Sequence, residues 1–262
     1  MSWLVGVLVS TVIVVLAVRA NVLSRNGAVA AIAVGTATIG GLGFAGAIVL
    51  LTFFVTSVAL SRVGRARKRA FVDVGKLGAR DSAQVLANGA VAAVCALAAL
   101  SGDPRATVAF AGAFAAATAD TWGTEIGTFV GGRPRSILSF RPVATGLSGG
   151  ITVVGTLAEI GGALLIAATA RLVGMEATAA IFVGGLAGAL ADSVLGASVQ
   201  SLRWCPACRR PCEVPVHSCG VATTPLRGLT WFGNDAVNLA ATVIGAAVAA
   251  TLAGAGASIR PT

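Results

Sequence analysis

Charged and aromatic residues are scarce in this sequence, and their scarcity narrows the class of protein. The 262 residues include ten acidic residues, one histidine and no tyrosine, and only 11% of the chain is charged. A soluble domain normally carries about 25% charged residues. Apolar residues make up 56% of the chain. The composition is that of an integral membrane protein, and a soluble enzyme or a nucleic-acid-binding domain is not expected.

Long apolar runs predict an all-α, polytopic membrane helix bundle that forms a single domain over residues 1–262. A crossing of about 30 Å of hydrocarbon needs about 20 apolar residues in a helix. Glycines at 35–43 leave one alternative open, in which 28–61 is a single broken segment, partly re-entrant. We predict about eight transmembrane spans, at residues 2–18, 28–41, 44–61, 82–100, 106–129, 147–173, 177–201 and 232–256.

The basic residues give an independent indication of topology. Of the 19 Lys and Arg residues, 16 lie in four connections, at 19–25, 62–80, 133–141 and 203–227. With eight spans all four connections fall on one side, and positively charged loops face the cytoplasm. We therefore expect both termini on the non-cytoplasmic side, in a prokaryotic plasma membrane. The net charge of +9 then reflects topology and attraction to anionic lipid.

Six acidic residues lie at or inside apolar spans. A carboxylate in hydrocarbon costs at least about 2.5–3.5 kcal/mol, so such residues normally face the bundle interior and mark a site. The predicted topology puts five of them in the cytoplasmic half of the bilayer and leaves Glu159 alone near the middle. The other four acids, Glu213 among them, are expected to be solvated in loops. The six are Asp81, Asp120, Glu125, Glu159, Asp192 and Asp235.

Polar neighbours accompany these acids on the same helix faces. Gln84 and Asn88 follow Asp81 at helical spacing, and Thr121 precedes Glu125 by one turn. Such side chains also form contacts between membrane helices, so a purely structural role is the alternative interpretation of these residues. Together with the carboxylates they form an oxygen-rich donor set that suits a hard cation such as magnesium. The remaining polar neighbours are Ser193, Asn234 and Asn238.

Two stretches near the predicted cytoplasmic surface suit a phosphate group. Lys76 and Arg80 precede Asp81 at the rim of the fourth span. A Gly-rich turn at a helix start offers backbone N–H groups to an anion, and residues 143–152 provide one where the sixth span begins. This turn does not match a Walker A motif. Its candidate residues are Thr145, Gly146, Ser148, Gly149 and Gly150.

The segment "CPACRRPCEVPVHSC" at 205–219 contains four of the five cysteines and the only histidine. A CxxC pair followed by a second ligand pair is typical of a structural zinc site, and a cytoplasmic location argues against disulfides. We expect Cys205, Cys208, His217 and Cys219 to be the ligands, with Cys212 a spare. The segment belongs to a predicted cytoplasmic loop, 202–230, between the last two spans.

Several motifs in order along the chain resemble one membrane family. They are "RDSAQVLANG", "ADTWGTEIG", "GLSGGIT", "ADSVLGASVQ", the "CPAC…HSCG" loop and "GNDAVNLAATVIGA". Together they resemble the multi-pass family catalogued as domain of unknown function ninety-two, which includes a plant phytyl-phosphate kinase. Cys212 is a departure from its pattern. The resemblance implies phosphoryl transfer from a nucleoside triphosphate, with CTP favoured, to an isoprenoid monophosphate such as phytyl or geranylgeranyl phosphate. Its matching positions are Asp81, Asn88, Asp120, Glu125, Asp192, Asn234 and Asp235.

The expected site combines the resemblance with the residues themselves. Asp120, Glu125, Asp192 and Asp235 are the predicted catalytic residues and would hold magnesium. The predicted partners are the lipid bilayer, a nucleoside triphosphate and an isoprenoid phosphate, with no nucleic acid. An ion-coupled transporter is the alternative function, because buried acids in Gly-rich helices also bind coupling ions. The predicted substrate-binding residues are Lys76, Arg80, Asp81, Gln84, Asn88, Thr121, Thr145, Gly146, Ser148, Gly149, Gly150, Ser193, Asn234 and Asn238.

Overall fold

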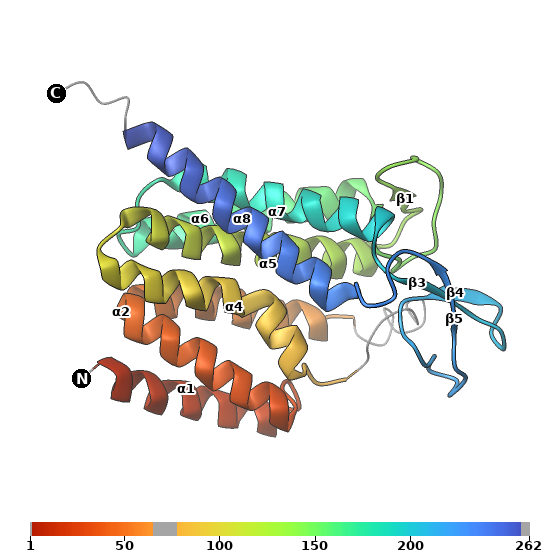
Figure 1. Cartoon of the computed structure of the whole chain (residues 1–262), viewed down its shortest axis with the longest axis horizontal. Helices are drawn as coiled ribbons and strands as arrows, with labels where there is room; N and C mark the ends of the chain where they lie inside the picture. The colour runs from red at the N-terminus through yellow and green to blue at the C-terminus, as the bar shows by residue number, and fades with distance from the viewer. Residues whose placement is uncertain (1, 65–77, 258–262) are drawn as a thin grey trace.

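The computed structural model describes residues 2–64 and 78–257, and these form a bundle of long helices with a small β-sheet at one end (Figure 1). The prediction of an all-α membrane bundle is confirmed, and short strands are added in the connections. The helices are α1 Ser2–Arg19, α2 Arg25–Arg62, α4 Ser82–Ala98, the 3₁₀ turn η1 Ala99–Ser101, α5 Pro104–Val130, α6 Val153–Leu172, α7 Thr178–Ser198 and α8 Asn234–Ala257.

The strands lie in two of the connections. β1 Arg135–Ser136 pairs antiparallel with β2 Gly150–Ile151 between α5 and α6. Between α7 and α8, β3 Leu202–Cys205, β4 Arg210–Cys212 and β5 Thr224–Arg227 form an antiparallel sheet in the order β4-β3-β5. The predicted loop at 202–230 thus contains a small sheet, and residues 202–227 are called the β-module below.

Polar residues fix where several helices begin. The first backbone N–H groups of a helix have no partner within it, so a side-chain oxygen just before the helix stabilises that end. In four helices such an oxygen accepts a backbone N–H of the first turn. The four residues are Ser24 before α2, Asp81 before α4, Asp103 before α5 and Thr152 before α6.

Helix α2 is broken at Gly43 and folds back on itself. Gly43 has φ 59° and ψ −145°, a conformation that a residue with a side chain rarely adopts. The first half packs against α1, where Gly35 contacts Ser10. The second half returns, so that Arg62 Nη2 donates to the carbonyl of Ala20 at 2.9 Å. The predicted segments 28–41 and 44–61 are therefore antiparallel halves of one broken helix.

The centre of the bundle is α5. Every residue from Val108 to Ala119 is buried, and the helix contacts α2, α4, α6, α7 and α8. Phe114 packs against Phe53 and Phe110, with ring centroids 5.4 and 5.2 Å apart. Within the described residues, five helices are long and apolar enough to cross a membrane, namely α2, α4 extended through η1, α6, α7 and α8. Helix α5 is not one of them, because the polar residues of its second half lower its apolarity.

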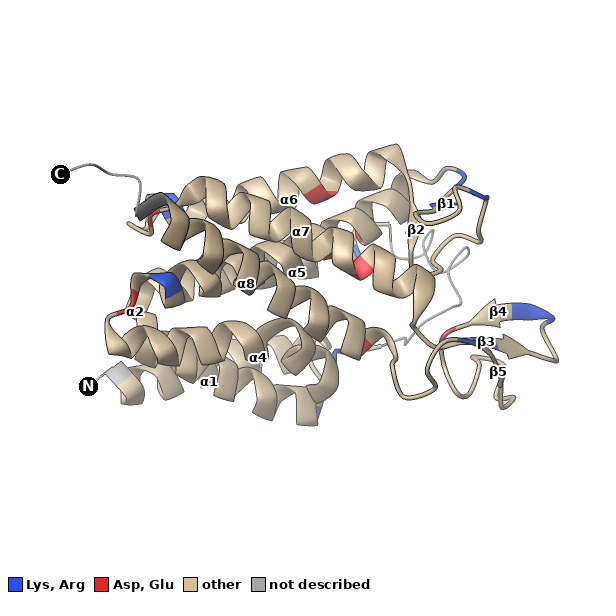
Figure 2. Cartoon of the chain, turned by 45° about the horizontal axis from the view of Figure 1, so that its top comes forward, with Lys and Arg blue, Asp and Glu red and all other residues tan. Residues whose placement is uncertain are grey.

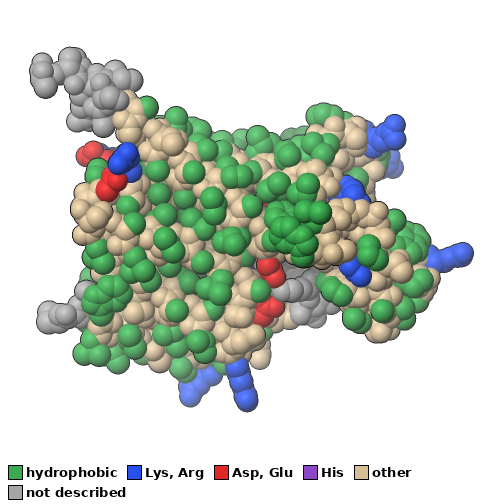
Figure 3. Space-filling model, viewed as in Figure 1, with side chains coloured by type: hydrophobic (Ala, Val, Ile, Leu, Met, Phe, Trp, Pro, Cys, Tyr) green, Lys and Arg blue, Asp and Glu red, His purple; other side chains and the backbone are tan. Residues whose placement is uncertain are grey.

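The two ends of the bundle differ. The connections at 20–24, 131–152 and 199–233 lie at one end, whereas α1 begins and α8 ends at the other (Figure 1). Charged positions gather toward the two ends, and the acidic positions inside the bundle lie in the half nearer the strands (Figure 2). Hydrophobic side chains cover the flank seen in Figure 3. An apolar belt between charged ends is the surface expected of a bundle surrounded by lipid.

Candidate functional site

A cavity of ≈ 930 Å³ lies at the end of the bundle that carries the strands. It is bordered by helices and by the β-module, and Figure 3 shows acidic side chains where these two parts meet. Asp81 does not line it, and Lys76 lies outside the described residues. The predicted site residues that do line it are Arg80, Gln84, Asn88, Asp120, Thr121, Glu125, Thr145, Gly146, Ser148, Gly149, Gly150, Asp192, Ser193, Asn234, Asp235 and Asn238.

Carboxylates from three helices and the β-module approach one another in this cavity. Asp120 of α5 and Asp192 of α7 lie close enough to interact electrostatically. Glu159 of α6 and Glu213 of the β-module also interact electrostatically with Asp192. Asp192 is only 8% exposed. Like charges in an environment of low polarity repel strongly, so this arrangement favours a bound cation.

The donor set fits a hard divalent cation. Asp192 Oδ2 is buried and has no hydrogen-bond partner among the described residues. Magnesium is usually held by one or two carboxylates together with substrate phosphates. Among the described residues, three or more Asp, Glu, Cys or His ligand atoms within 4.8 Å of one another occur only in the Cys/His group. No three carboxylates of the described residues therefore form a metal site by themselves, and a metal here would need further oxygen ligands.

Arg80 is fixed at the rim by its backbone. Its N–H donates to the carbonyl of Val22 at 2.9 Å, and its carbonyl accepts the N–H of Ser24 at 3.0 Å. Burial lowers the pKa of the Arg80 guanidinium, and the nearby Glu125 carboxylate opposes that shift. Because arginine stays protonated in proteins, the rim carries a fixed positive charge beside an acid.

Asp81 belongs to the start of α4. Its Oδ1 accepts the N–H of Gln84 at 2.9 Å, and Gln84 Oε1 accepts the N–H of Asp81 at 3.1 Å, which makes a capping box. Asn88 Nδ2 donates to the carbonyl of Gln84 at 3.0 Å. Gln84 and Asn88 line the cavity, whereas Asp81 holds the helix that presents them. A structural role thus accounts for Asp81 without a substrate contact.

The Gly-rich turn before α6 already binds an anionic group. The Ser148 N–H and hydroxyl donate to the two carboxylate oxygens of Glu213, each at 2.8 Å. Gln200 Nε2 donates to the same carboxylate at 2.7 Å. Gly149 has φ 77°, and a Cβ there would lie 2.5 Å from the Ala197 Cβ of α7, so only glycine fits. The turn is packed directly on α7 and directs its donors at an acid.

The structure places two acidic residues differently from the prediction made from the sequence. Glu213 was expected to be solvated, yet it lines the cavity and its pKa is raised by burial, while the donors Ser148 and Gln200 oppose that rise. No local pattern marks it, because its partner Ser148 is 65 residues away. Glu159 was placed apart from the other acids by its depth, and it borders the same cavity.

Most aliphatic residues that line the cavity come from α1, α2 and the start of α4. The same helices also contribute polar lining residues, Ser10 and Ser61 among them. The aliphatic set is called the apolar arm below. It includes Val9, Ile13, Val34, Ile39, Leu50 and Val85.

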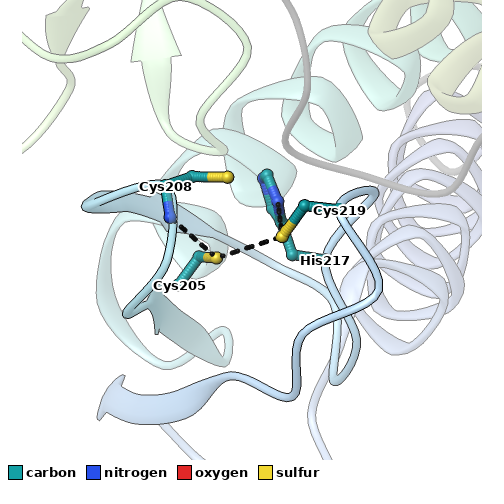
Figure 4. Close-up of side chains that lie close together, drawn as sticks. All are labelled: Cys205, Cys208, His217 and Cys219. Atoms are coloured by element: carbon teal, nitrogen blue, oxygen red, sulfur yellow. Dashed lines mark hydrogen bonds between the residues drawn. The ribbon is translucent and has the colours of Figure 1, made fainter.

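The predicted zinc ligands come together in the β-module (Figure 4). Cys205 and Cys208 lie at the turn between β3 and β4, and His217 and Cys219 lie at a second turn closed by the Val216–Ala222 bridge. The four ligand atoms lie within 4.8 Å of one another. Cys212 is not part of the group, and its Sγ is 3.9 Å from the carbonyl of Val214.

Comparison with known sequences establishes the family. The model of the family described as "Integral membrane protein DUF92" matches residues 8–246. The chain belongs to this family. The family membership expected from the motifs is confirmed, and the bilayer is the environment of a DUF92 protein. No solved structure matches the chain.

The relatives of this DUF92 chain include archaeal and plant proteins. An uncharacterized membrane protein of Methanocaldococcus jannaschii is 34% identical over 197 residues, which is 74% of this chain and 81% of the relative. Protein PGR of Arabidopsis thaliana is 30% identical over 226 residues, 75% of this chain and 77% of the relative. The chloroplastic protein VTE6 of Arabidopsis thaliana is 26% identical over 238 residues, 87% of this chain and 64% of the relative.

Proposed function

We propose that this protein is a membrane kinase that transfers a phosphoryl group from a nucleoside triphosphate, with CTP the favoured donor, to an isoprenoid monophosphate. Phytyl and geranylgeranyl phosphate are the expected acceptors. The observation that carries the proposal is a single cavity with a carboxylate-rich, oxygen-rich part and an aliphatic arm. A ligand that matches both parts has an anionic, metal-binding head and a hydrocarbon tail.

The dimensions and position of the cavity suit such a ligand. Its ≈ 930 Å³ is near the upper end of the roughly 300–1,000 Å³ found for small-molecule sites. The polar part borders the strand-bearing end, which is the cytoplasmic side in the predicted topology and therefore the side with nucleotide. The apolar arm between α1, α2 and α4 would take the prenyl tail.

The reaction is a displacement at the γ-phosphorus. An oxygen of the prenyl monophosphate forms a bond to that phosphorus, and the bond from it to the β–γ bridging oxygen breaks. The products are the prenyl diphosphate and the nucleoside diphosphate. A phosphate monoester is already largely ionised near neutral pH, so the site needs no strong general base. Catalysis is then mainly positioning and charge neutralisation.

The residues divide into two roles. Asp120, Glu125, Asp192 and Asp235 would hold one or two magnesium ions, which neutralise the charge that develops on the phosphate oxygens. Arg80 would bind phosphate beside the 145–150 turn, whose Ser148 N–H and hydroxyl are directed at Glu213. The amide side chains of the cavity would orient substrate oxygens, and those residues are Gln84, Asn88, Asn234 and Asn238.

Family evidence supports the same class of reaction. The motifs resemble the family that includes a plant phytyl-phosphate kinase, and the similarity to VTE6 supports a role in prenyl-phosphate metabolism. An ion-coupled transporter is the second candidate, because Asp192 and Glu159 are acids between packed helices, as in carriers. A carrier has no need of an aliphatic arm beside its acids, which favours the kinase.

A turnover assay with matched variants tests the proposal. Purified protein in detergent would receive magnesium, CTP or ATP, and phytyl, geranylgeranyl or farnesyl monophosphate. Asp120→Asn and Asp192→Asn should lower diphosphate formation by about 10²-fold or more, the scale expected when a charge-stabilising group is removed. Asp103→Asn is the control, since Asp103 caps α5 at the opposite end. Equal activity in all three variants would refute the assigned site.

A further inference from the structure

The β-module has little hydrophobic core of its own. Its strands contain four, three and four residues, and none of its described residues belongs to the hydrophobic clusters of the bundle. A three-stranded sheet of this size needs a metal, a disulfide or another support to be stable. The buried residues of the module are instead Cys205, Cys212, His217 and Thr223.

Two of the distances among the Cys and His ligand atoms match those expected around a tetrahedral zinc ion. Zinc bonds of about 2.3 Å to sulfur and about 2.0 Å to nitrogen place two sulfur ligands about 3.8 Å apart and a sulfur and a nitrogen about 3.5 Å apart. Cys205 Sγ lies 3.7 Å from Cys219 Sγ, and His217 Nδ1 lies 3.3 Å from Cys219 Sγ. The Cys208 N–H donates to Cys205 Sγ at 3.4 Å (Figure 4), a contact that stabilises a thiolate.

The β-module also forms a wall of the cavity. Glu213 directly follows β4 and accepts hydrogen bonds from Ser148 and Gln200. Arg203 of β3 lines the same cavity and donates to Thr223 Oγ1 at 2.7 Å. The position of the module therefore decides whether Glu213 reaches the Gly-rich turn.

We propose that Cys205, Cys208, His217 and Cys219 bind one structural Zn²⁺ ion and that this ion holds Glu213 in contact with Ser148 at the wall of the cavity. Four protein ligands fill a tetrahedral coordination, so no position is open to a substrate. The ion acts on the cavity through the conformation of the β-module. This inference is independent of the reaction that the cavity performs.

Metal analysis tests the first half of the proposal. Protein purified from zinc-supplemented cells, without chelator, should contain about one zinc per chain, with three sulfur ligands and one nitrogen ligand by X-ray absorption. Cys208→Ala and His217→Ala should lose it. Cys95→Ser, in α4, and Cys212→Ala, inside the module but outside the group, should keep it.

Three results would overturn the zinc site. They are wild-type protein without zinc, equal zinc loss in Cys212→Ala and Cys208→Ala, and an intact mass 2 Da lower that indicates a disulfide among these cysteines. The wild-type measurement decides the question even where a ligand variant fails to fold.

Hydrogen–deuterium exchange tests the second half. The Ser148 amide donates to Glu213, so zinc removal by a chelator should speed its exchange about tenfold or more. Glu213→Ala should exchange fast with zinc still bound, which separates the contact from the metal site. The buried segment 108–119 of α5 is the internal control. Unchanged exchange at 145–152 after zinc removal would overturn the link between the ion and the cavity wall.

Discussion

Replacing Val9 by Trp should change which prenyl chain length the protein accepts. Val9 lines the apolar arm from α1, and α1 packs on α2 at the edge of the bundle (Figure 1). The acids on α5 and α7 are elsewhere in the cavity. A larger side chain at Val9 therefore meets the tail of a bound lipid and leaves its phosphate head untouched.

The free-energy cost of Val9→Trp for a long prenyl tail comes from packing and not from transfer out of water. A prenyl tail enters from detergent or lipid, which is as apolar as the arm, so the hydrophobic term is small. Forcing extra atoms into a filled apolar space costs about 1–3 kcal/mol. That corresponds to roughly 5- to 150-fold in kcat/KM for a tail that reaches Val9. A tail too short to reach it loses nothing.

The assay compares kcat/KM for monophosphates of ten, fifteen and twenty carbons. Val9→Trp should lower the value for the longest chain by at least about fivefold and spare the shortest. Leu8→Trp is the matched control, since Leu8 is 59% exposed on the outer face of the same helix. Equal losses for all chain lengths, or the same loss in Leu8→Trp, would refute the placement of the tail in this arm.

The helix cap at Asp81 and the turn at Gly149 can each be tested by substitution. Asp81→Ala should destabilise the protein by about 0.5–2 kcal/mol, because it removes the α4 cap. Asp81→Asn should keep both the cap and the turnover. Thermal unfolding and the activity assay check both variants, and a stable but inactive Asp81→Asn would give Asp81 a chemical role instead. Gly149→Ala should lower the melting temperature and the turnover, because its φ of 77° and the 2.5 Å approach to Ala197 exclude a Cβ. Gly161→Ala is the control, since a Cβ there meets its nearest neighbour, Trp122, at an ordinary 3.6 Å, and a similar loss in that control would count against the reasoning.

The acids could be located from the sequence because burying them has a high cost. Asp120, Asp192 and Asp235 stand out in apolar runs, and a membrane helix tolerates such residues only toward an interior site. The structure brings all three to one cavity. The capping box at Asp81 could also be predicted, since Asp followed by Gln three residues later is its pattern. The other acids in apolar spans instead favoured the assignment of Asp81 to the site.

Long-range contacts could not be derived in this way. Glu213 reaches Ser148 across 65 residues, and Arg227 Nη2 donates at 2.9 Å to the carbonyl of Gly196, near the end of α7. Neither contact has a local signature. The glycines at 35–43 indicated a break in the second apolar region, but several glycines were equivalent in the sequence and only the structure identifies Gly43. The number of membrane crossings and the side on which the termini lie stay predictions.

The proposed kinase activity is tested most directly by following a labelled phosphoryl group. Purified protein in detergent, magnesium, phytyl monophosphate and CTP labelled with ³²P at the γ position would be mixed, and the lipid products separated. We expect label in a prenyl diphosphate, formed in step with nucleoside diphosphate. Label that stays in the aqueous phase for every nucleotide and every acceptor, with a protein shown to be folded, would contradict the kinase and direct attention to ion flux in liposomes.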